Sequence, residues 1–166
     1  MTGIAATDPT SIATVRWACL PFAALTVATL HALVKLRQDV FVVEQLCPYP
    51  DLDGRDPDCL HLYAEDDQGV LAYLRIVPPS RHESGCPSLG RVCTAARARR
   101  DGYGRELVQR GLVELTAAHP DQDCVIGAQG YLRRFYESCG FVVFDQPYVE
   151  DGIPHFHMRR PAGVMR

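Results

Sequence analysis

Two apolar, β-favouring runs at residues 61–64 and 70–77 are separated only by the acidic, glycine-containing segment 65–69. Such runs around a short connection predict a β-hairpin, and Pro78 and Pro79 end its second strand because proline cannot donate a backbone hydrogen bond. Residues 89–94 predict a third short strand. A chain with these three strands near its middle must form a β-sheet, and we expect its other segments to extend or cover that sheet.

Helical and strand patterns alternate on both sides of this hairpin. Thr26 is placed to cap a first helix, and a second helix begins near Gly102 and ends at His119-Pro120. The expected elements, in chain order, are a strand over 14–20, a helix over 26–40, strands over 61–64, 70–77 and 89–94, a helix from 102, a strand over 124–128, a helix over 131–138, and strands over 141–144 and 156–159 joined through Asp151-Gly152. This order predicts an α/β fold with one mixed sheet flanked by helices.

Length and composition fit one globular domain. The chain has 166 residues and a formal net charge of −3, and its pI is near 6.0. This charge argues against a general nucleic-acid binder, which usually presents a strongly basic surface. Residues 1–13 are small and polar and predict an N-terminal tail, which leaves residues 14–161 as a single domain.

Neither secretion nor membrane insertion is predicted. The apolar stretch 17–34 is interrupted by Pro21 and His31, and no basic segment precedes it. The seven cysteines are odd in number and form no CxxC pair, so we expect reduced thiols and a cytoplasmic protein. His155 and His157 alternate on an expected strand, but nothing brings a third ligand to them, and we expect no metal site.

The densest chemical signal is the strand-to-helix junction at residues 91–105. It combines arginines with Gly102 and Gly104 where the second long helix begins. A helix N-terminus presents unpaired amides and a partial positive charge, and glycine lets the backbone approach an anion closely. The junction therefore predicts a phosphate-binding loop. It lacks the Gly-Lys-Ser/Thr of a Walker loop and the spacing of a dinucleotide fingerprint.

The same junction resembles motif A of the GNAT superfamily of acetyl-CoA-dependent N-acetyltransferases. Residues 135–141, Phe-Tyr-Glu-Ser-Cys-Gly-Phe, resemble the motif B of that superfamily, in the expected order and at the expected separation. Segments 36–54 and 148–155 are similar to the ElaA-type branch. The resemblance covers about residues 15–161 and implies a mixed, mostly antiparallel sheet splayed between strands 4 and 5, with acetyl-CoA in the gap.

The resemblance also implies the cofactor contacts. Backbone groups of Val92, Cys93 and Thr94 would meet the pantetheine arm and the thioester oxygen, and Gln129 would contact the cofactor. Tyr136 matches the tyrosine that protonates the departing thiolate. The loop around the pyrophosphate would consist of Arg99, Arg100, Asp101, Gly102, Tyr103, Gly104 and Arg105.

The acceptor side is less well defined. Arg37, Glu44, Gln45 and His155 are expected to contact the substrate. Many relatives carry a glutamate base five residues before the position of Gln129, but Cys124 stands there, so Glu44 is the candidate general base. The acids Asp51, Asp53, Asp56 and Asp58 allow two interpretations, a solvated loop or a negative patch that attracts a cationic amine.

These features predict transfer of an acetyl group from acetyl-CoA to a primary amine by direct attack in a ternary complex. The acceptor can be a small molecule or a peptidyl amine, and a homodimer stays open. Two alternatives remain at this point. The chain can be a catalytically silent CoA-binding sensor, which an intact Tyr136 disfavours, or a redox-responsive thiol protein.

Overall fold

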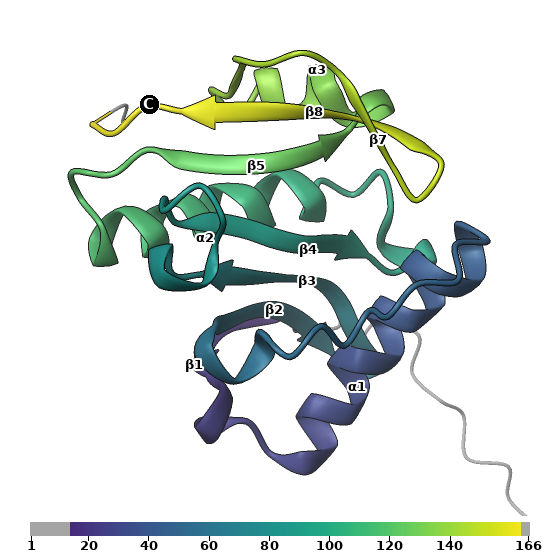
Figure 1. Ribbon diagram of the computed structural model, residues 1–166. Helices are drawn as coiled ribbons and strands as arrows, with labels where there is room; N and C mark the ends of the chain where they lie inside the picture. The colour runs from purple at the N-terminus through teal and green to yellow at the C-terminus, as the bar shows by residue number, and fades with distance from the viewer. Residues whose placement is uncertain (1–13, 164–166) are drawn as a thin grey trace, which may run out of the picture.

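The computed structural model describes residues 14–163, so the predicted tail at 1–13 lies outside the described residues. Two four-stranded sheets form the described fold (Figure 1). The first has the order β1-β2-β3-β4, and the second has the order β5-β8-β6 with β7 paired to β8. The predicted mixed sheet flanked by helices is confirmed, and its division lies between β4 and β5.

The first sheet is wholly antiparallel. It contains β1 (Arg16–Pro21), β2 (Leu60–Asp66), β3 (Gly69–Val77) and β4 (Ser88–Thr94). The predicted hairpin is β2 and β3, and its connection is shorter than expected because β2 runs on to Asp66. Two helices cover its faces. Leu33, Leu36 and Val40 pack on one face with Tyr63 and Tyr73.

The helix on that face is α1 (Val27–Arg37), which continues as the π-helical segment η2 (Gln38–Glu44). Its start is as predicted, because Thr26 Oγ1 accepts a hydrogen bond from the Thr29 amide at 3.0 Å. Its end lies beyond the predicted residue 40. Short 3₁₀ segments complete the helical structure: η1 (Phe22–Ala24), η3 (Asp56–Asp58), η4 (Pro79–Arg81), η5 (Ala96–Ala98) and η6 (Gly130–Leu132).

The opposite face of the first sheet packs against α2 (Tyr103–Ala118). Leu107, Val108, Leu112 and Leu115 form the buried stripe of this helix. Gly111 lets α2 approach closely, since a Cβ at this position would lie 2.9 Å from Leu74 Cδ2. The same core continues into the second sheet through Ile126 and Met158.

The second sheet contains β5 (Cys124–Gln129), β6 (Val142–Val143), β7 (Tyr148–Glu150) and β8 (Ile153–Arg160), with α3 (Arg133–Glu137) beside it. Strand β7 was not predicted. Asp151 and Gly152 have φ values of +48° and +78° and connect the paired residues Glu150 and Ile153. Two residues with positive φ make the type I′ turn that Asp-Gly favours, so β7 and β8 form a tight hairpin.

The two sheets touch at one end of their junction. The Val125 amide of β5 donates to the Pro87 carbonyl, just before β4, at 3.1 Å. Figure 1 shows β4 and β5 running in the same direction and separating toward their C-terminal ends. The residues that follow each strand are therefore held apart, and α2 begins near this opening.

A buried ion-pair cluster ties the long loop between η2 and β2 to the first sheet. Three arginines from α1, β3 and β4 meet three aspartates of that loop: Arg37, Arg75 and Arg91 with Asp51, Asp53 and Asp56. Asp56 Oδ1 lies 2.9 Å from nitrogens of both Arg37 and Arg75. Arg75 also bonds Asp53. The loop is thus fixed against the sheet by charge as well as by packing.

Removal of the Asp56 carboxylate should destabilise the fold strongly. Asp56→Ala leaves two buried guanidiniums short of their shared partner, and loss of one member of a buried ion pair costs about 3–5 kcal/mol. Urea unfolding at pH 7 should show this loss as a lower midpoint. Asp58→Ala is the matched control, because Asp58 pairs with Arg81 at the surface, where both side chains are about half exposed, and should change stability little. Equal midpoints for the two variants would contradict the role of the cluster.

Candidate functional site

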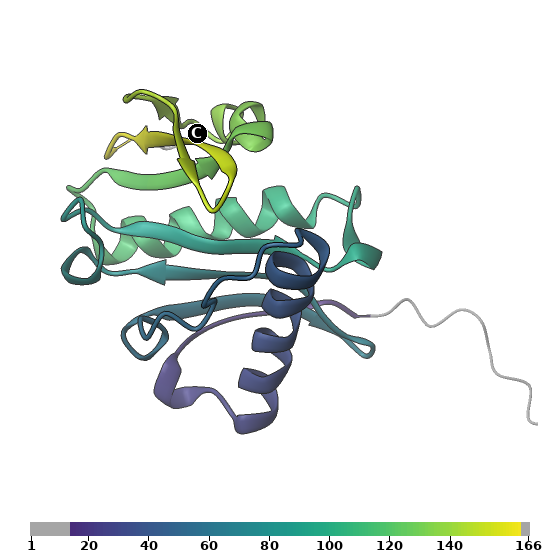
Figure 2. The ribbon, with the colours of Figure 1, turned by 45° about the vertical axis from the view of Figure 1, so that its right-hand side comes forward.

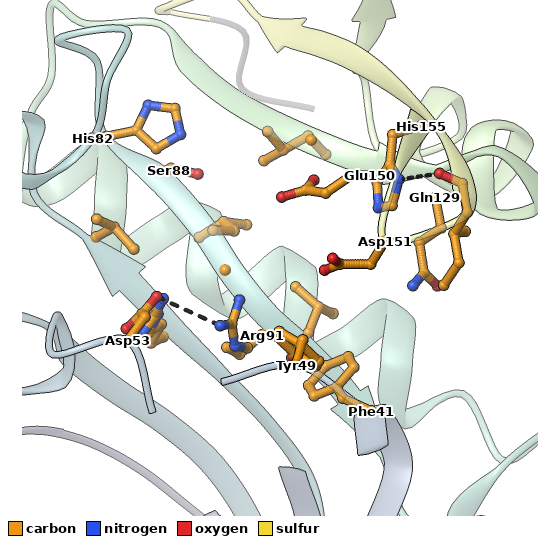
Figure 3. A pocket seen from close by; sticks show the side chains of 18 of the residues that line it. Phe41, Tyr49, Asp53, His82, Ser88, Arg91, Gln129, Glu150, Asp151 and His155 are labelled. Atoms are coloured by element: carbon orange, nitrogen blue, oxygen red, sulfur yellow. Dashed lines mark hydrogen bonds and ion pairs between the residues drawn. The ribbon is translucent and has the colours of Figure 1, made fainter. Parts of the chain in front are cut away.

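A cavity of about 550 Å³ lies where the two sheets separate. Its walls come from β4, β5, the loop after η2 and the β7–β8 hairpin (Figure 3). Figure 2 shows this hairpin projecting from the second sheet toward the end of the helix formed by α1 and η2. The tip of the hairpin reaches the loop after η2, since Cys47 Sγ lies 4.0 Å from the Asp151 carbonyl oxygen.

A β-bulge shapes the β4 wall of the cavity. Tyr73 pairs with Cys93 and Arg75 pairs with Gly90, so two residues of β4, Arg91 and Val92, oppose Leu74 alone. Arg91 has φ +54°, which is unusual for a residue with a side chain. A bulge bends its strand and interrupts the ladder, and here it does so at the division between the sheets.

The Arg91 side chain holds this strained position. Its Nε donates to Asp51 Oδ1 at 2.7 Å, its Nη2 donates to the Asp51 carbonyl at 3.1 Å, and its guanidinium lies over the Tyr49 ring. Backbone strain of this kind persists only where surrounding contacts fix it. The bulge is therefore anchored to the ion-pair cluster.

Of the three predicted backbone contacts, Val92 belongs to the bulge, and Cys93 and Thr94 follow it. Val92 lines the cavity, whereas the Cys93 side chain is buried beneath α1, where burial raises the pKa of its thiol to about 12. Thr94 Cγ2 lies 3.7 Å from a Cβ built on Gly104, which places the end of β4 against the start of α2. The prediction concerned their backbone groups, and β4 is the strand of the first sheet that borders the opening.

The loop before α2 has the geometry of an anion cradle. Gly102 is the N-cap residue with φ +86°, and a Cβ built on it meets no atom within 4 Å. The first bonds of α2 run from the Arg105 and Glu106 amides to the Gly102 carbonyl, which leaves the Tyr103 and Gly104 amides without an intrahelical acceptor. The neighbouring Arg100, Asp101 and Arg105 side chains are exposed. Arg105 reaches the α3 side, where Nη2 donates to Ser138 Oγ at 3.0 Å. This loop fits a diphosphate, because it offers amides, positive charge and open space.

Tyr136 lines the cavity from α3 and is only 5% exposed. Phe135 and Phe141 hold its ring through edge contacts with centroids 5.0 and 5.7 Å away. Burial raises the pKa of its hydroxyl well above the usual value. The phenol therefore stays protonated at neutral pH and can donate a proton into the cavity.

Gln45 and Gln129 bridge the two sides of the site. Gln129 Nε2 donates to Gln45 Oε1 at 3.1 Å, and Gln45 Nε2 lies 3.4 Å from Gln129 Oε1. Tyr131 also donates to Gln129 Oε1 at 2.6 Å. Both predicted glutamines line the cavity, so the structure brings them together although they are far apart in sequence.

His155 has one engaged and one available ring nitrogen. It is 8% exposed, lies opposite Gln129 in the sheet, and its Nδ1 is 2.8 Å from the Ile153 carbonyl oxygen. A carbonyl only accepts, so Nδ1 carries the proton and the neutral ring has its lone pair on Nε2. Figure 3 shows the His155 ring directed into the cavity between the β7–β8 hairpin and β5.

The predicted contact between Arg37 and the substrate is wrong. Arg37 is 1% exposed, and its guanidinium nitrogens donate to Asp51 and Asp56. The side chain is enclosed in the ion-pair cluster, where no substrate reaches it. The carboxylates of Asp51, Asp53 and Asp56 are likewise paired with arginines. Of the two interpretations of this loop, the pairing argues against a negative patch that attracts a cationic amine.

Glu44 also does not fit its predicted roles. Its two carboxylate oxygens each accept a hydrogen bond at 2.7 Å from Arg99, and this pairing lowers its pKa. A carboxylate held in this way is a poor proton acceptor, and Glu44 is not among the residues that line the cavity. The predicted phosphate contact of Arg99 is altered for the same reason, because its guanidinium is engaged by Glu44.

Several cavity residues had no predicted role. They include Ser88, the first residue of β4, which pairs with Val77, and Tyr148. The Tyr148 hydroxyl oxygen would lie 2.5 Å from a Cβ built on Gly127. Gly127 therefore makes room for Tyr148, and Tyr148 stacks on His155 and His157. The Asp151-Gly152 pair was the available signal for this hairpin.

The cysteines, possible metal ligands and helix lengths were expected to have no special role, and the structure describes each of them. All seven cysteines are free thiols, and burial raises the pKa of Cys124 to about 12, so it cannot replace a glutamate base. Within residues 14–163, no group of three or more His, Cys, Asp or Glu side chains is arranged to hold a metal. In the same part of the chain, no helix is long and apolar enough to cross a membrane.

Comparison with known proteins gives consistent matches. Residues 48–161 match the family model described as the acetyltransferase (GNAT) domain. Protein ElaA of Escherichia coli is 38% identical over 148 residues, which are 88% of this chain and 96% of ElaA. Its crystal structure matches with a TM-score of 0.81 and 36% identity, covering 89% of this chain and 99% of that one. The crystal structure of an acyl-CoA N-acyltransferase from Pseudomonas aeruginosa matches with a TM-score of 0.82 and 44% identity, covering 87% and 99%.

Proposed function

Because the chain belongs to the GNAT acetyltransferase family, we propose that it transfers an acetyl group from acetyl-CoA to a primary amine within one ternary complex. It is an acyl-CoA-dependent acyltransferase, and the acetyl donor, the amine acceptor and the direct attack are the proposed part. One observation supports them most. The buried phenol of Tyr136 and the available Nε2 of His155 line the same cavity, beside the split between β4 and β5.

Each end of the donor has a matching feature in this chain. The open turn at Gly102 and the first amides of α2 would hold the pyrophosphate. The edge of β4 at Val92 and Thr94 would bond the pantetheine arm. When bound there, acetyl-CoA supplies a thioester whose carbonyl carbon accepts the amine and whose sulfur departs as a thiolate.

The proton transfers fall to two side chains. His155 Nε2 accepts the proton that the amine loses as its nitrogen bonds to the carbonyl carbon, and the Ile153 carbonyl stabilises the resulting imidazolium through Nδ1. A backbone amide of β4 donates to the oxygen on which negative charge develops. Tyr136 gives its proton to the sulfur as the carbon–sulfur bond breaks. His155 thus replaces Glu44 as the proposed base.

Gly102→Glu should abolish tight binding of acetyl-CoA. The new side chain places bulk and negative charge in the loop that would hold the pyrophosphate. Isothermal titration calorimetry should show a Kd at least about tenfold weaker, which corresponds to about 1.4 kcal/mol. Gly102→Ala carries the same backbone strain without the charge and should bind more tightly than Gly102→Glu. A folded wild type that binds neither acetyl-CoA nor CoA would overturn the proposed function.

Tyr136→Phe should separate catalysis from binding. The substitution removes only the hydroxyl and keeps the ring contacts with Phe135 and Phe141. Loss of a general acid typically costs about 10²–10⁴ in rate, so kcat should fall by about that factor while the calorimetric Kd for acetyl-CoA stays constant. A CoA-binding sensor would show no acetyl transfer even in the wild type, and unchanged turnover in Tyr136→Phe would exclude the acid role.

His155→Gln should lower kcat by about 10²-fold or more if His155 is the base. The loss should shrink for acceptor amines of lower pKa, since a larger fraction of such amines arrives deprotonated. His157→Gln is the matched control. The Nδ1 atom of His157 lies 3.4 Å from Asp145, whereas the Nδ1 atom of His155 is hydrogen-bonded to the Ile153 carbonyl. A loss in His155→Gln that is the same for all amines would indicate a structural role only.

A further inference from the structure

The guanidinium groups that line the cavity are already neutralised by aspartates. Arg75 pairs with Asp53 and Asp56, and Arg91 pairs with Asp51 and Asp53. The Arg55 Nε also lies 4.0 Å from Asp53. These contacts leave little positive charge directed at a ligand in the acceptor part of the cavity.

Three other carboxylates line the same cavity without such partners. They are Glu83, Glu150 and Asp151, and within residues 14–163 none of their carboxylates takes part in an ion pair or a hydrogen bond. Figure 3 shows the side chains of Glu150 and Asp151 pointing from the β7–β8 hairpin into the cavity. Asp151 lies in the turn of this hairpin, with φ +48°.

The carboxylates come from two separate segments of the chain. Glu83 belongs to the loop before β4, and Glu150 ends β7. After burial, the charges of Glu150 and Glu83 both contribute to raising the pKa of Tyr148, to about 12. Glu83 and Glu150 thus line one cavity together with Tyr148.

Two polar side chains that are mostly buried, Ser88 and His155, also line the cavity. Ser88 is 4% exposed and lines the cavity, and no hydrogen bond of its hydroxyl occurs among the described residues. His155 is nearly as buried, and its Nε2 has no partner there either. The lone pair of His155 Nε2 accepts a hydrogen bond, and the Ser88 hydroxyl can accept or donate one, so both side chains can bind an amine in the cavity.

We propose that the acceptor is a short aliphatic diamine or polyamine. Its reacting amine lies at His155, and its second ammonium lies among Glu83, Glu150 and Asp151. The inference rests on the proposed function and specifies its acceptor. A cavity of about 550 Å³ suits a small molecule, and the hairpin tip against the loop at Cys47 limits its extent on one side. The carboxylates of Glu83, Glu150 and Asp151 are the groups in this part of the cavity whose charge no ion pair among the described residues neutralises.

A matched set of acceptors tests the proposal. 1,4-Diaminobutane, 1-aminobutane and 4-aminobutanoate share a four-carbon chain and a primary amine, and differ in the charge at the far end. Steady-state kinetics with acetyl-CoA should give the highest kcat/KM for the diamine and the lowest for the amino acid, at low ionic strength. The preference for the diamine should weaken as salt is added.

Variants of the hairpin identify the groups responsible. Glu150→Gln and Asp151→Asn should each reduce the preference for the diamine over 1-aminobutane by about threefold, the range of a partly exposed charge pair, and the double variant by about tenfold. In each variant kcat/KM should fall more for the diamine than for 1-aminobutane, because 1-aminobutane has no second ammonium. Glu114→Gln, on α2 and outside this cavity, is the control and should keep the preference.

The outcomes separate the two proposals. Equal kcat/KM values for the diamine and 1-aminobutane, or a preference that survives in the double variant, would overturn the acceptor assignment while acetyl transfer to amines still stands. Turnover of a lysine peptide but of no small diamine would also overturn it. Consumption of acetyl-CoA with none of these amines would contradict the proposed function itself.

Discussion

The cluster of Arg37, Arg75 and Arg91 with three aspartates is the constraint on which the site depends. Each guanidinium belongs to a different element, so the cluster fixes α1, β3 and β4 relative to one loop. Buried charges are costly unless they are paired and hydrogen-bonded. The loop therefore has one favourable position, and that position sets one edge of the cavity.

The bulge in β4 depends on the same contacts. Arg91 adopts φ +54°, and its side chain is held by Asp51. The bulge bends β4 where β5 would otherwise continue to pair with it. In this way the charge cluster, whose Arg75 and Arg91 line the cavity, helps to maintain the opening between the sheets. The strain is local, and the stabilisation that offsets it comes from residues about forty positions earlier in the chain.

The sequence predicted those features whose physics is local. The start of α1 at Thr26, the β2–β3 hairpin and the glycine turn before α2 each depend on neighbouring residues, and the two family motifs placed Tyr136. Glu44 and Arg37 were misinterpreted because their partners are distant: Arg99 is 55 residues from Glu44, and Asp56 is 19 residues from Arg37. From the sequence alone, an aspartate in a polar loop is expected to be solvated, because its arginine partner is known only from the fold. The β7–β8 hairpin was readable from Asp151-Gly152, although β7 itself is only three residues long.

The two walls of the cavity differ in how firmly they are held. The β4 wall is joined to the ion-pair cluster and to the main core, so changes there affect folding. The β7–β8 hairpin pairs with the rest of the protein mainly through β8, and its turn carries exposed carboxylates. Residues on such a turn can be substituted with little effect on the stability of the fold. An acyltransferase built in this way can keep the donor half constant while the acceptor half determines which amine it takes.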